Sequence, residues 1–243
     1  MFIVNLNQTN LIVELNKAFK NILYIDKNHQ YFNTVTGKEL VPTTTFKKRF
    51  QNKFDNKEYW LSKKAEEEGI TPEEMQDEWD CKRIVGTKRG GIIHDFAEHM
   101  SHRREMTLPL DMTGMGLLKR QVKQYFKDHP EDYTIVTELV IGDEVRGGQV
   151  DRLISRNNKV GIVDYKTDSK TEEQLNASYN KFMKEHLSHL PDTILNGYFV
   201  QINLYRQILV NAGFEIDFME IIHFCIHNKQ YKKYIVPKFD VIV

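Results

Sequence analysis

The sequence predicts an α+β fold in which a central mixed β-sheet is flanked by helices. Apolar residues recur with a helical period of about 3.6 in the first half of the chain and then alternate with a period of about 2. A long apolar helix pattern follows the alternating segments, and two further strand patterns end the chain. Helices, meandering strands, one helix and more strands, in this order, are typical of a single mixed domain.

Length and composition fit one soluble domain. The chain has 243 residues, of which 40% are hydrophobic and 28% charged. We expect one domain over residues 1–243, with an N-terminal hairpin and helical extension at 1–80 and the core at 81–243. Basic and acidic residues balance at 34 each. This balance excludes the global field of a strongly basic nucleic-acid binder but leaves room for a local basic track.

Two cysteines, Cys81 and Cys225, are too few for a disulfide framework, a four-cysteine zinc site or an all-cysteine iron–sulfur cluster. We expect both to be buried thiols in a reducing compartment. The sequence contains no apolar run of about 20 residues and no signal-peptide pattern at its start. We therefore expect a cytoplasmic protein, or one that works in the cytoplasm of a host cell.

Helix signals dominate residues 46–130. The segment Thr71-Pro72-Glu73-Glu74 is a capping box with proline at the first helical position, and it predicts a helix through residue 85. Residues 86–105 predict a second helix with a glycine-rich entrance, and 113–130 a third that ends at Pro130. Before them, two short β-like runs, NILYID and HQYFNT, precede turn and break signals in TGKELVPTTT.

Strand signals begin at residue 132. Segments 132–142, 144–155 and 159–167 predict three meandering strands, whereas 169–190 is ambiguous between a loop and helical pieces. Residues 192–213 predict an amphipathic helix that Gly213 closes. A final hairpin is predicted from IDFMEIIHFCIHN and QYKKYIVPKF.

The hairpin in residues 147–168 carries the most informative constellation. Asn157-Asn158 is a plausible two-residue turn, because asparagine tolerates positive φ. Residues equally far from such a turn are paired, which sets Asp151 directly opposite Asp164 with Cβ atoms about 5 Å apart. Lys166 lies two residues after Asp164 and therefore on the same face of its strand.

Two carboxylates this close repel each other unless a cation joins them, and a hard divalent cation prefers oxygen ligands. Such a cation polarises a phosphoryl oxygen and activates water, and a nearby lysine can orient or help deprotonate that water. The pattern therefore indicates metal-assisted hydrolysis of a phosphodiester. The alternative interpretation is an exposed hairpin with ordinary surface charges.

Other polar residues have spacings that fit such a site. His94 and Glu98 share a helix face, although a lone helical histidine is more often structural. No second histidine stands at the spacing of a His-Glu-x-x-His zinc site. Glu138 lies within an apolar strand and points either to solvent or to the site. Gln201 and Tyr205 again share a helix face, where a tyrosine is more often part of the core.

Taken in order, these pieces resemble the PD-(D/E)XK nuclease superfamily and, within it, the RecB-type and lambda-exonuclease-like branch. The match consists of Gly-x-x-His (Gly91 to His94) with Glu98, the strand glutamate Glu138, Gly-x-x-Asp-Arg (Gly148 to Arg152), Asp-Tyr-Lys-Thr (Asp164 to Thr167) and Gln-x-x-x-Tyr (Gln201 to Tyr205). It spans roughly residues 86–206, and the leading region 22–80 matches only loosely. Val150 stands where the superfamily name has proline.

The resemblance implies a restriction-endonuclease-like core, a mixed sheet flanked by helices, with a helical N-terminal part. It implies that Asp151 and Asp164 are metal carboxylates, that the backbone carbonyl of Tyr165 and the ring of His94 complete the metal shell, and that Lys166 acts on the attacking water. The catalytic residues would be Lys166, Asp151 and Asp164. Supporting roles would fall to Glu98, Glu138, Gln201 and Tyr205.

The implied activity is that of a free-standing, phage-type DNA exonuclease in recombination, repair or replication, dependent on Mg²⁺ with Mn²⁺ able to substitute. The sequence has no Walker-type loop, and we expect no nucleotide cofactor, no iron–sulfur cluster and no membrane partner. The expected partner is DNA, single-stranded or at its ends. Candidate DNA contacts are Arg83, Lys88, Arg89, Arg152 and Arg206, with Phe50 and Trp60 as candidates for a groove.

Two other interpretations remain at this stage. One is a nucleic-acid-binding module on a nuclease fold without cleavage, which the intact Asp151, Asp164 and Lys166 disfavour. The other is a recombination or packaging accessory protein whose acidic hairpin is incidental. The residues leave open exonuclease versus endonuclease action, polarity, strand preference and the number of metals. They also leave open whether the chain forms a homo-oligomer or works with a recombination or replication partner.

Overall fold

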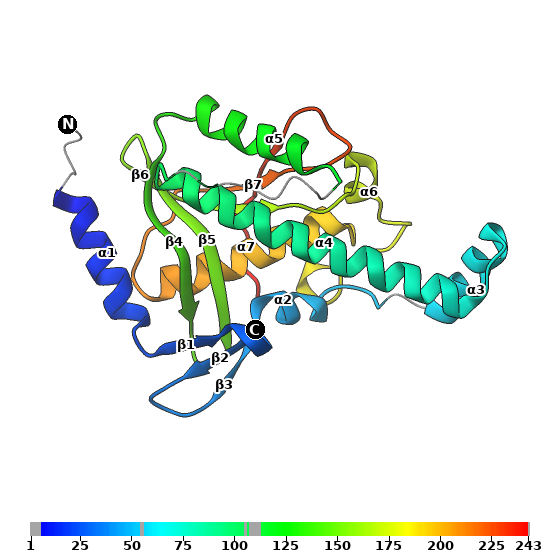
Figure 1. Ribbon diagram of the computed structural model, residues 1–243. Coiled ribbons are helices and arrows are strands. Elements are labelled where there is room, and N and C mark those ends of the chain that lie inside the picture. Colours follow the sequence, from blue (N-terminus) through cyan, green and yellow to red (C-terminus); the bar gives the residue numbers. More distant parts are fainter. Residues whose placement is uncertain (1–5, 54–55, 105, 107–112, 243) are drawn as a thin grey trace.

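The computed structural model describes residues 6–53, 56–104, 106 and 113–242, and it has an eight-stranded mixed sheet with helices on both faces (Figure 1). The α+β prediction is confirmed. The α-helices are α1 (Leu6–Phe19), α2 (Thr43–Phe46), α3 (Lys57–Glu68), α4 (Pro72–Ser101), α5 (Met115–Asp128), α6 (Glu172–Asn176) and α7 (Ile194–Asn211), and the short 3₁₀ turns are η1 (Asp26–Asn28), η2 (Lys47–Arg49) and η3 (Glu185–Leu187).

The sheet combines antiparallel and parallel pairs. Its strands are β1 (Ile22–Ile25), β2 (Gln30–Asn33), β3 (Glu39–Pro42), β4 (Tyr133–Gly142), β5 (Arg146–Arg156), β6 (Lys159–Lys166), β7 (Phe218–His223) and β8 (Lys232–Ile235). The order is β1-β2-β3-β5-β6-β7-β8, and β4 pairs with the remaining edge of β5. The predicted meander (β4, β5, β6) and the final hairpin (β7, β8) are both confirmed as antiparallel pairs. The β3–β5 and β6–β7 pairs are parallel.

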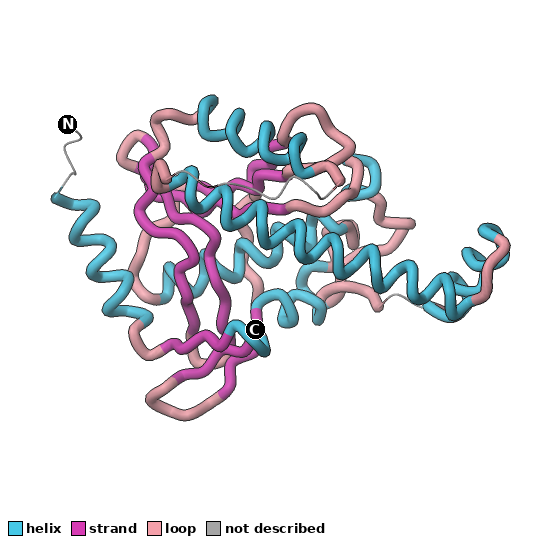
Figure 2. The backbone as a smooth tube through the Cα atoms, in the orientation of Figure 1, coloured by secondary structure: helices cyan, strands magenta, loops and turns pink. Residues whose placement is uncertain are grey.

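Alternation along the central strands divides the core into two layers. Leu153 and Ile162 face one side, where they pack with residues of α1 and α7. Ile154 and Val163 face the other side, where they pack with residues of α4 and α5. Because successive side chains of a strand point to opposite faces, a strand that is buried on both faces reads as a continuous apolar run. The tube view shows these helices on either side of the strands (Figure 2).

Helix α4 begins as predicted but is longer than predicted. The Thr71 hydroxyl accepts a hydrogen bond from the Glu74 amide at 3.2 Å, and the Glu74 carboxylate accepts one from the Thr71 amide at 2.8 Å. The two expected helices at 73–85 and 86–105 are one continuous helix, which corrects the prediction. Glycines tolerate helical φ, and a Cβ at Gly90 would lie 2.8 Å from Thr167 Oγ1. Gly90 therefore allows close packing against the residue that follows β6, and it does not mark a helix start.

The N-terminal region is part of the sheet, not a separate extension. Strand β3 pairs in parallel with the start of β5, with Val41 opposite Arg146 and Pro42 opposite Gly147. The expected boundary between residues 80 and 81 falls inside α4. The strand in TGKELVPTTT was not predicted. It pairs antiparallel with the neighbouring β2, and its parallel pairing with β5, more than 100 residues away, leaves no turn signal in the sequence.

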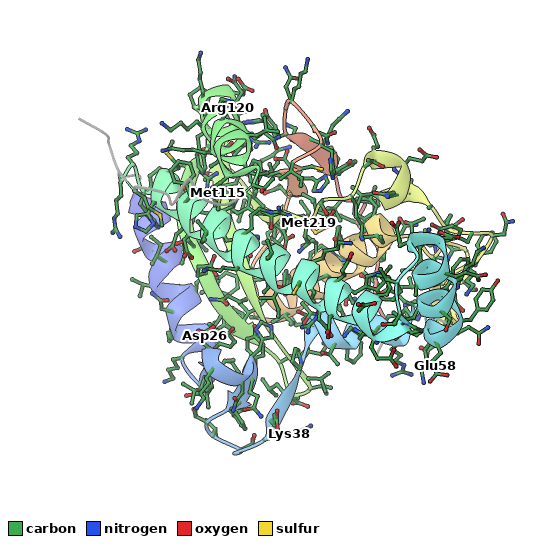
Figure 3. All side chains as sticks on the ribbon, turned by 45° about the vertical axis from the view of Figure 1, so that its right-hand side comes forward. Asp26, Lys38, Glu58, Met115, Arg120 and Met219 are labelled. Carbon is green, nitrogen blue, oxygen red and sulfur yellow. The ribbon has the colours of Figure 1, made fainter. Side chains whose placement is uncertain are left out.

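Helix α3 and the first half of α4 form an arm that projects from the sheet (Figure 1). The rotated view shows the arm from nearer its tip, where Glu58 marks α3 (Figure 3). Tyr59 and Trp60 are exposed on α3. Among the helices of the described residues, none is both long enough and apolar enough to cross a membrane.

Candidate functional site

The predicted hairpin has the predicted register. Asn157 and Asn158 both have positive φ, 52° and 62°, as the two-residue turn requires. The β5–β6 ladder runs from Arg156–Lys159 to Arg152–Val163 and ends one pair short of Asp151 and Asp164. Beyond that point β5 pairs with β3 instead of β6. The Asp151 carboxylate there accepts a hydrogen bond from the Tyr165 amide at 2.6 Å.

Asp164 and Lys166 share one face of β6, as expected. Asp164 is 1% exposed, and its Oδ2 atom lies 2.6 Å from Lys166 Nζ. The contact is an ion pair, and among the described residues this buried oxygen has no hydrogen-bond partner. A buried ion pair with an unused acceptor is costly unless a further group uses it.

Glu138 turns toward the site, which resolves the alternative that the sequence left open. Its neighbours pair as Thr137–Arg152 and Leu139–Val150, so Glu138 stands opposite Asp151 in the β4–β5 ladder. Its φ of 50° lies in the left-handed region, which is unusual for a residue other than glycine in a strand. Strained backbone of this kind often occurs where a side chain must be aimed at a functional site.

Three potential metal ligands meet at this point. His94 on α4 places its Nδ1 atom 3.5 Å from Asp151 Oδ2. One ligand atom each from His94, Glu138 and Asp151 lies within 4.8 Å of the other two. The edge of the His94 ring packs against the Tyr165 ring, with centroids 5.9 Å apart. Helix α4 and strands β4 and β5 thus each contribute one donor to the same small volume.

The electrostatics of these carboxyl groups call for a cation. Burial, with the negative charges of Asp151 and Glu98, raises the pKa of Glu138 to about 8. Burial and the charge of Asp164 raise the pKa of Asp151 to about 6, although His94, Lys166 and the Tyr165 amide act in the opposite direction. Neighbouring acids with raised pKa values would ionise together if a divalent ion joined them. The donor set therefore fits a metal ion.

Lys166 remains a cation despite its burial. Burial by itself would lower its pKa, but the charges of Asp164 and Asp151 and the close contact with the Asp164 carboxylate raise it overall. At neutral pH the side chain is therefore an ammonium group. It can donate to a water molecule or to a phosphate oxygen, but it is not poised to accept a proton.

Glu98 supports the site from the side. Its Oε1 atom accepts a hydrogen bond from the Thr137 hydroxyl at 3.1 Å, and the same hydroxyl contacts His102 Nε2 at 2.9 Å. Glu98 therefore ties α4 to strand β4 next to Glu138. It contributes negative charge to the cluster without belonging to the three closest donors.

Gln201 and Tyr205 are buried in the site wall on α7, at 4% and 3% exposure. Gln201 Nε2 lies 2.8 Å from the Tyr205 hydroxyl, and Gln201 Oε1 accepts a hydrogen bond from Lys47 at 3.0 Å. A Cβ at Gly148 would lie 2.5 Å from Tyr205 Cε1, so only glycine leaves room for the ring. The glycine and glutamine motifs thus meet through the Tyr205 ring.

The predicted DNA contacts separate into exposed and buried residues. Arg83 and Lys88 lie exposed along α4. Arg89 and Arg152 are buried, at 8% and 2% exposure, which corrects their prediction as surface contacts. Arg152 donates to the Thr134 hydroxyl at 2.9 Å and lies over the Phe126 ring, because β5 is covered there by α5.

The remaining candidates for DNA contact also divide. Arg206 donates to the Asp240 carboxylate at 2.7 Å and to the Phe239 carbonyl at 3.1 Å, so it secures the C-terminal segment. Phe50 is fully buried in the cluster around α2 and α7 and cannot stack on a base, which corrects that suggestion. Trp60, at 40% exposure, is the aromatic candidate that remains accessible.

Sequence reasoning missed four polar residues that border the site: Lys47, Asp168, Tyr198 and His223. The Tyr198 hydroxyl donates to Asp168 at 2.6 Å, and His223 Nε2 lies 3.3 Å from the same carboxylate. Burial alone would raise the pKa of Asp168, but the hydrogen bonds from His223 and Tyr198 lower it to about 2. No local pattern marks these residues, since they meet only through the parallel β6–β7 pair and the path of α7.

No protein-family model matches this chain, and no curated protein matches it either. The case for a function therefore rests on the residues and geometry of the site itself.

Proposed function

We propose that this protein is a Mg²⁺-dependent DNA nuclease that hydrolyses phosphodiester bonds, and that it acts as an exonuclease. The observation that carries the proposal is the meeting of His94, Glu138 and Asp151, whose ligand atoms lie within 4.8 Å of one another. The buried Asp164–Lys166 ion pair lies on the next strand of the same corner of the sheet. Carboxylates, an imidazole and a lysine together suit hydrolysis of a phosphate ester better than a purely structural role.

The metal would be held by Asp151, Glu138 and His94. Two carboxylates and one imidazole favour a hard or borderline divalent ion, and Mg²⁺ or Mn²⁺ suits a phosphate substrate. Asp164 and the Tyr165 carbonyl are further candidate ligands by resemblance. When bound, the ion would polarise a phosphoryl oxygen and lower the pKa of a water molecule.

The protein's own side chains would do the remaining work. Lys166 would donate a hydrogen bond to the phosphate or to the attacking water, and Asp164 would hold its ammonium in place. Glu138, opposite Asp151, would take up a proton at neutral pH in the absence of metal and release it when the metal binds. Exposed Arg83 and Lys88 would guide the DNA backbone along α4.

The resemblance to PD-(D/E)XK nucleases supports this proposal in one respect. The residues that carry it come from α4, β4, β5, β6 and α7, and they lie around one corner of the sheet rather than on scattered surfaces. The same corner contains the raised carboxyl pKa values that mark functional clusters.

The proposal is tested by digestion of linear DNA labelled at one end and of closed circles, whose cleavage is followed by gel mobility. The substrates are linear and closed-circular, single-stranded and double-stranded, each incubated with Mg²⁺ and with EDTA. We expect loss of label from linear DNA with Mg²⁺ and none with EDTA. Cleavage of a closed circle would replace exonuclease with endonuclease action.

The catalytic variants provide the control. Asp151→Asn and Asp164→Asn should abolish cleavage while the circular dichroism spectrum and the melting temperature stay close to those of the wild type. If the wild type binds DNA but does not cleave it under any metal condition, the protein is a binding module on this fold. Cleavage that survives in both variants would remove these carboxylates from the mechanism.

A further inference from the structure

Lys47 lies at the site without a carboxylate partner. It lies on η2, directly after the short α2 helix, and its Nζ donates to Gln201 Oε1 at 3.0 Å. The same ammonium lies 5.0 Å from the centroid of the Tyr198 ring. Among the described residues, no carboxylate oxygen lies within the 4.0 Å that an ion pair with Lys47 would need. An ammonium has three donors, and here a single amide oxygen occupies one of them.

Lys47 shares its surroundings with a second ammonium. Lys166 Nζ also lies 5.0 Å from the Tyr198 ring centroid, so one aromatic ring carries two cations. The ring is fixed, because its hydroxyl donates to Asp168 at 2.6 Å. Burial and the charge of Lys166 lower the pKa of Lys47 to about 7, and only Asp164 raises it appreciably. Asp164, the acid that raises the pKa of Lys47, is already paired with Lys166, so the Lys47 ammonium keeps donors for a further anion.

The amide that holds Lys47 is itself fixed. Gln201 uses its Nε2 group on the Tyr205 hydroxyl, which leaves Oε1 as the acceptor that faces Lys47. Tyr205 packs on Gly148, where a side chain would collide with the ring. A chain of contacts from Gly148 through Tyr205 and Gln201 therefore determines where the Lys47 ammonium lies.

We propose that Lys47 is a second phosphate-contacting lysine of this site, that it binds a non-bridging oxygen of the DNA phosphodiester beside Lys166, and that Gln201 is the positioning residue that holds it there. The proposal rests on the proposed nuclease function and names the group that would recognise the substrate phosphate. It also gives Gln201 a specific task, since Gln201 is buried and acts on the substrate through Lys47 rather than by direct contact.

Binding without metal tests the proposal independently of catalysis. Affinity for a fluorescent single-stranded oligodeoxynucleotide is measured in EDTA over a series of KCl concentrations. Lys47→Ala should weaken binding about 10- to 100-fold and reduce the slope of log Kd against log salt by about one, the change expected when one phosphate contact is lost. Lys47→Arg should keep the slope. Lys159→Ala is the matched control, because Lys159 is exposed at the turn end of β6 and should change affinity less than about threefold.

Cleavage kinetics test the role of Gln201. We expect Lys47→Ala to lower kcat/KM about 10- to 100-fold. Gln201→Ala should have a smaller effect that disappears in the Lys47→Ala background, because the glutamine acts through the lysine. A thermal melt of each variant checks that the fold is intact, and Lys47→Met provides a second uncharged variant, with the same expected losses, if Lys47→Ala does not fold.

The outcomes separate this proposal from the proposed function. Unchanged affinity and salt slope in Lys47→Ala, or effects of Lys47→Ala and Gln201→Ala that multiply, would overturn the lysine assignment while wild-type cleavage leaves the nuclease intact. A wild type that binds DNA with a Lys47-dependent slope but does not cleave it would support the phosphate contact and overturn the nuclease. A wild type that neither binds nor cleaves DNA would overturn both.

Discussion

Replacing Glu138 with glutamine removes one charge from the acidic cluster and keeps the size of the side chain. In the metal-free protein the pKa of Glu138 is raised from 4.5 to about 8, first by burial and then by Asp151 and Glu98. The folded state therefore holds a proton that the unfolded state has released between about pH 4.5 and 8. The folded protein therefore loses stability as pH rises through this window. Above about pH 8, ionised Glu138 destabilises the folded state.

The size of the effect follows from the shift. At about 1.4 kcal/mol per unit, a shift from 4.5 to about 8 corresponds to nearly 5 kcal/mol. Because the side chain is only partly buried, solvent screening reduces this, and we expect about 2 kcal/mol. Glu138→Gln should thus be more stable than the wild type by about 2 kcal/mol at pH 9, and nearly equal to it at pH 5, where folded wild-type Glu138 is protonated.

Urea denaturation at the two pH values, in EDTA and in Mg²⁺, measures this. Mg²⁺ at 100 times its Kd stabilises a protein by about 2.7 kcal/mol, and a tenfold loss of affinity reduces that gain to about 1.4 kcal/mol. We expect the wild type to show the larger gain in stability from Mg²⁺ at pH 9, and Glu138→Gln the smaller one. Glu144→Gln, in the exposed turn after β4, is the control. A Glu138→Gln protein that is no more stable at pH 9, and that gains as much from Mg²⁺, would refute the reasoning.

Three further predictions follow from the same geometry. Lys166→Met should lower the cleavage rate about 100-fold or more, while a calorimetric titration should show that metal binding is retained. Equal losses of cleavage and of metal binding would make Lys166 a structural residue. Asp168→Asn should lower the free energy of unfolding by about 1–2 kcal/mol at pH 7. The lowered pKa of Asp168 contributes stability that is present above pH 3.8 and lost as pH falls to about 2. Urea denaturation at pH 7 and 2.5 tests whether that pH dependence disappears in the variant. Gly148→Ala should cost about 1–3 kcal/mol in the same melts, because its Cβ would meet Tyr205, and an unchanged midpoint would show that the ring can move.

Local patterns were sufficient for much of the fold. The capping box placed the start of α4 at Pro72, and the asparagine pair placed the turn and the register of the β5–β6 hairpin. Both features depend on residues close together in the chain. The same holds for the shared face of Asp164 and Lys166, which follows from the two-residue repeat of a strand.

Features that depend on distant partners were missed or wrong. The parallel pairing of β3 with β5 joins segments more than 100 residues apart, and without that pairing Lys47 was one basic residue in a charged run. The direction of Glu138 depends on its positive φ, which no propensity of glutamate predicts. Arg152 was predicted to contact DNA because nothing in the neighbouring sequence indicates that α5 covers β5 at this residue.

A calorimetric titration with Mn²⁺ at pH 7, in two buffers of different ionisation enthalpy, tests the proposed metal centre. We expect one carboxylate-dependent site in the wild type, with release of about one proton on binding, since Glu138 with a pKa of about 8 is mostly protonated at this pH. We expect no such site in Asp151→Asn. Absence of binding in the wild type, or binding of equal affinity in Asp151→Asn, would contradict the metal centre and the hydrolysis proposed for it.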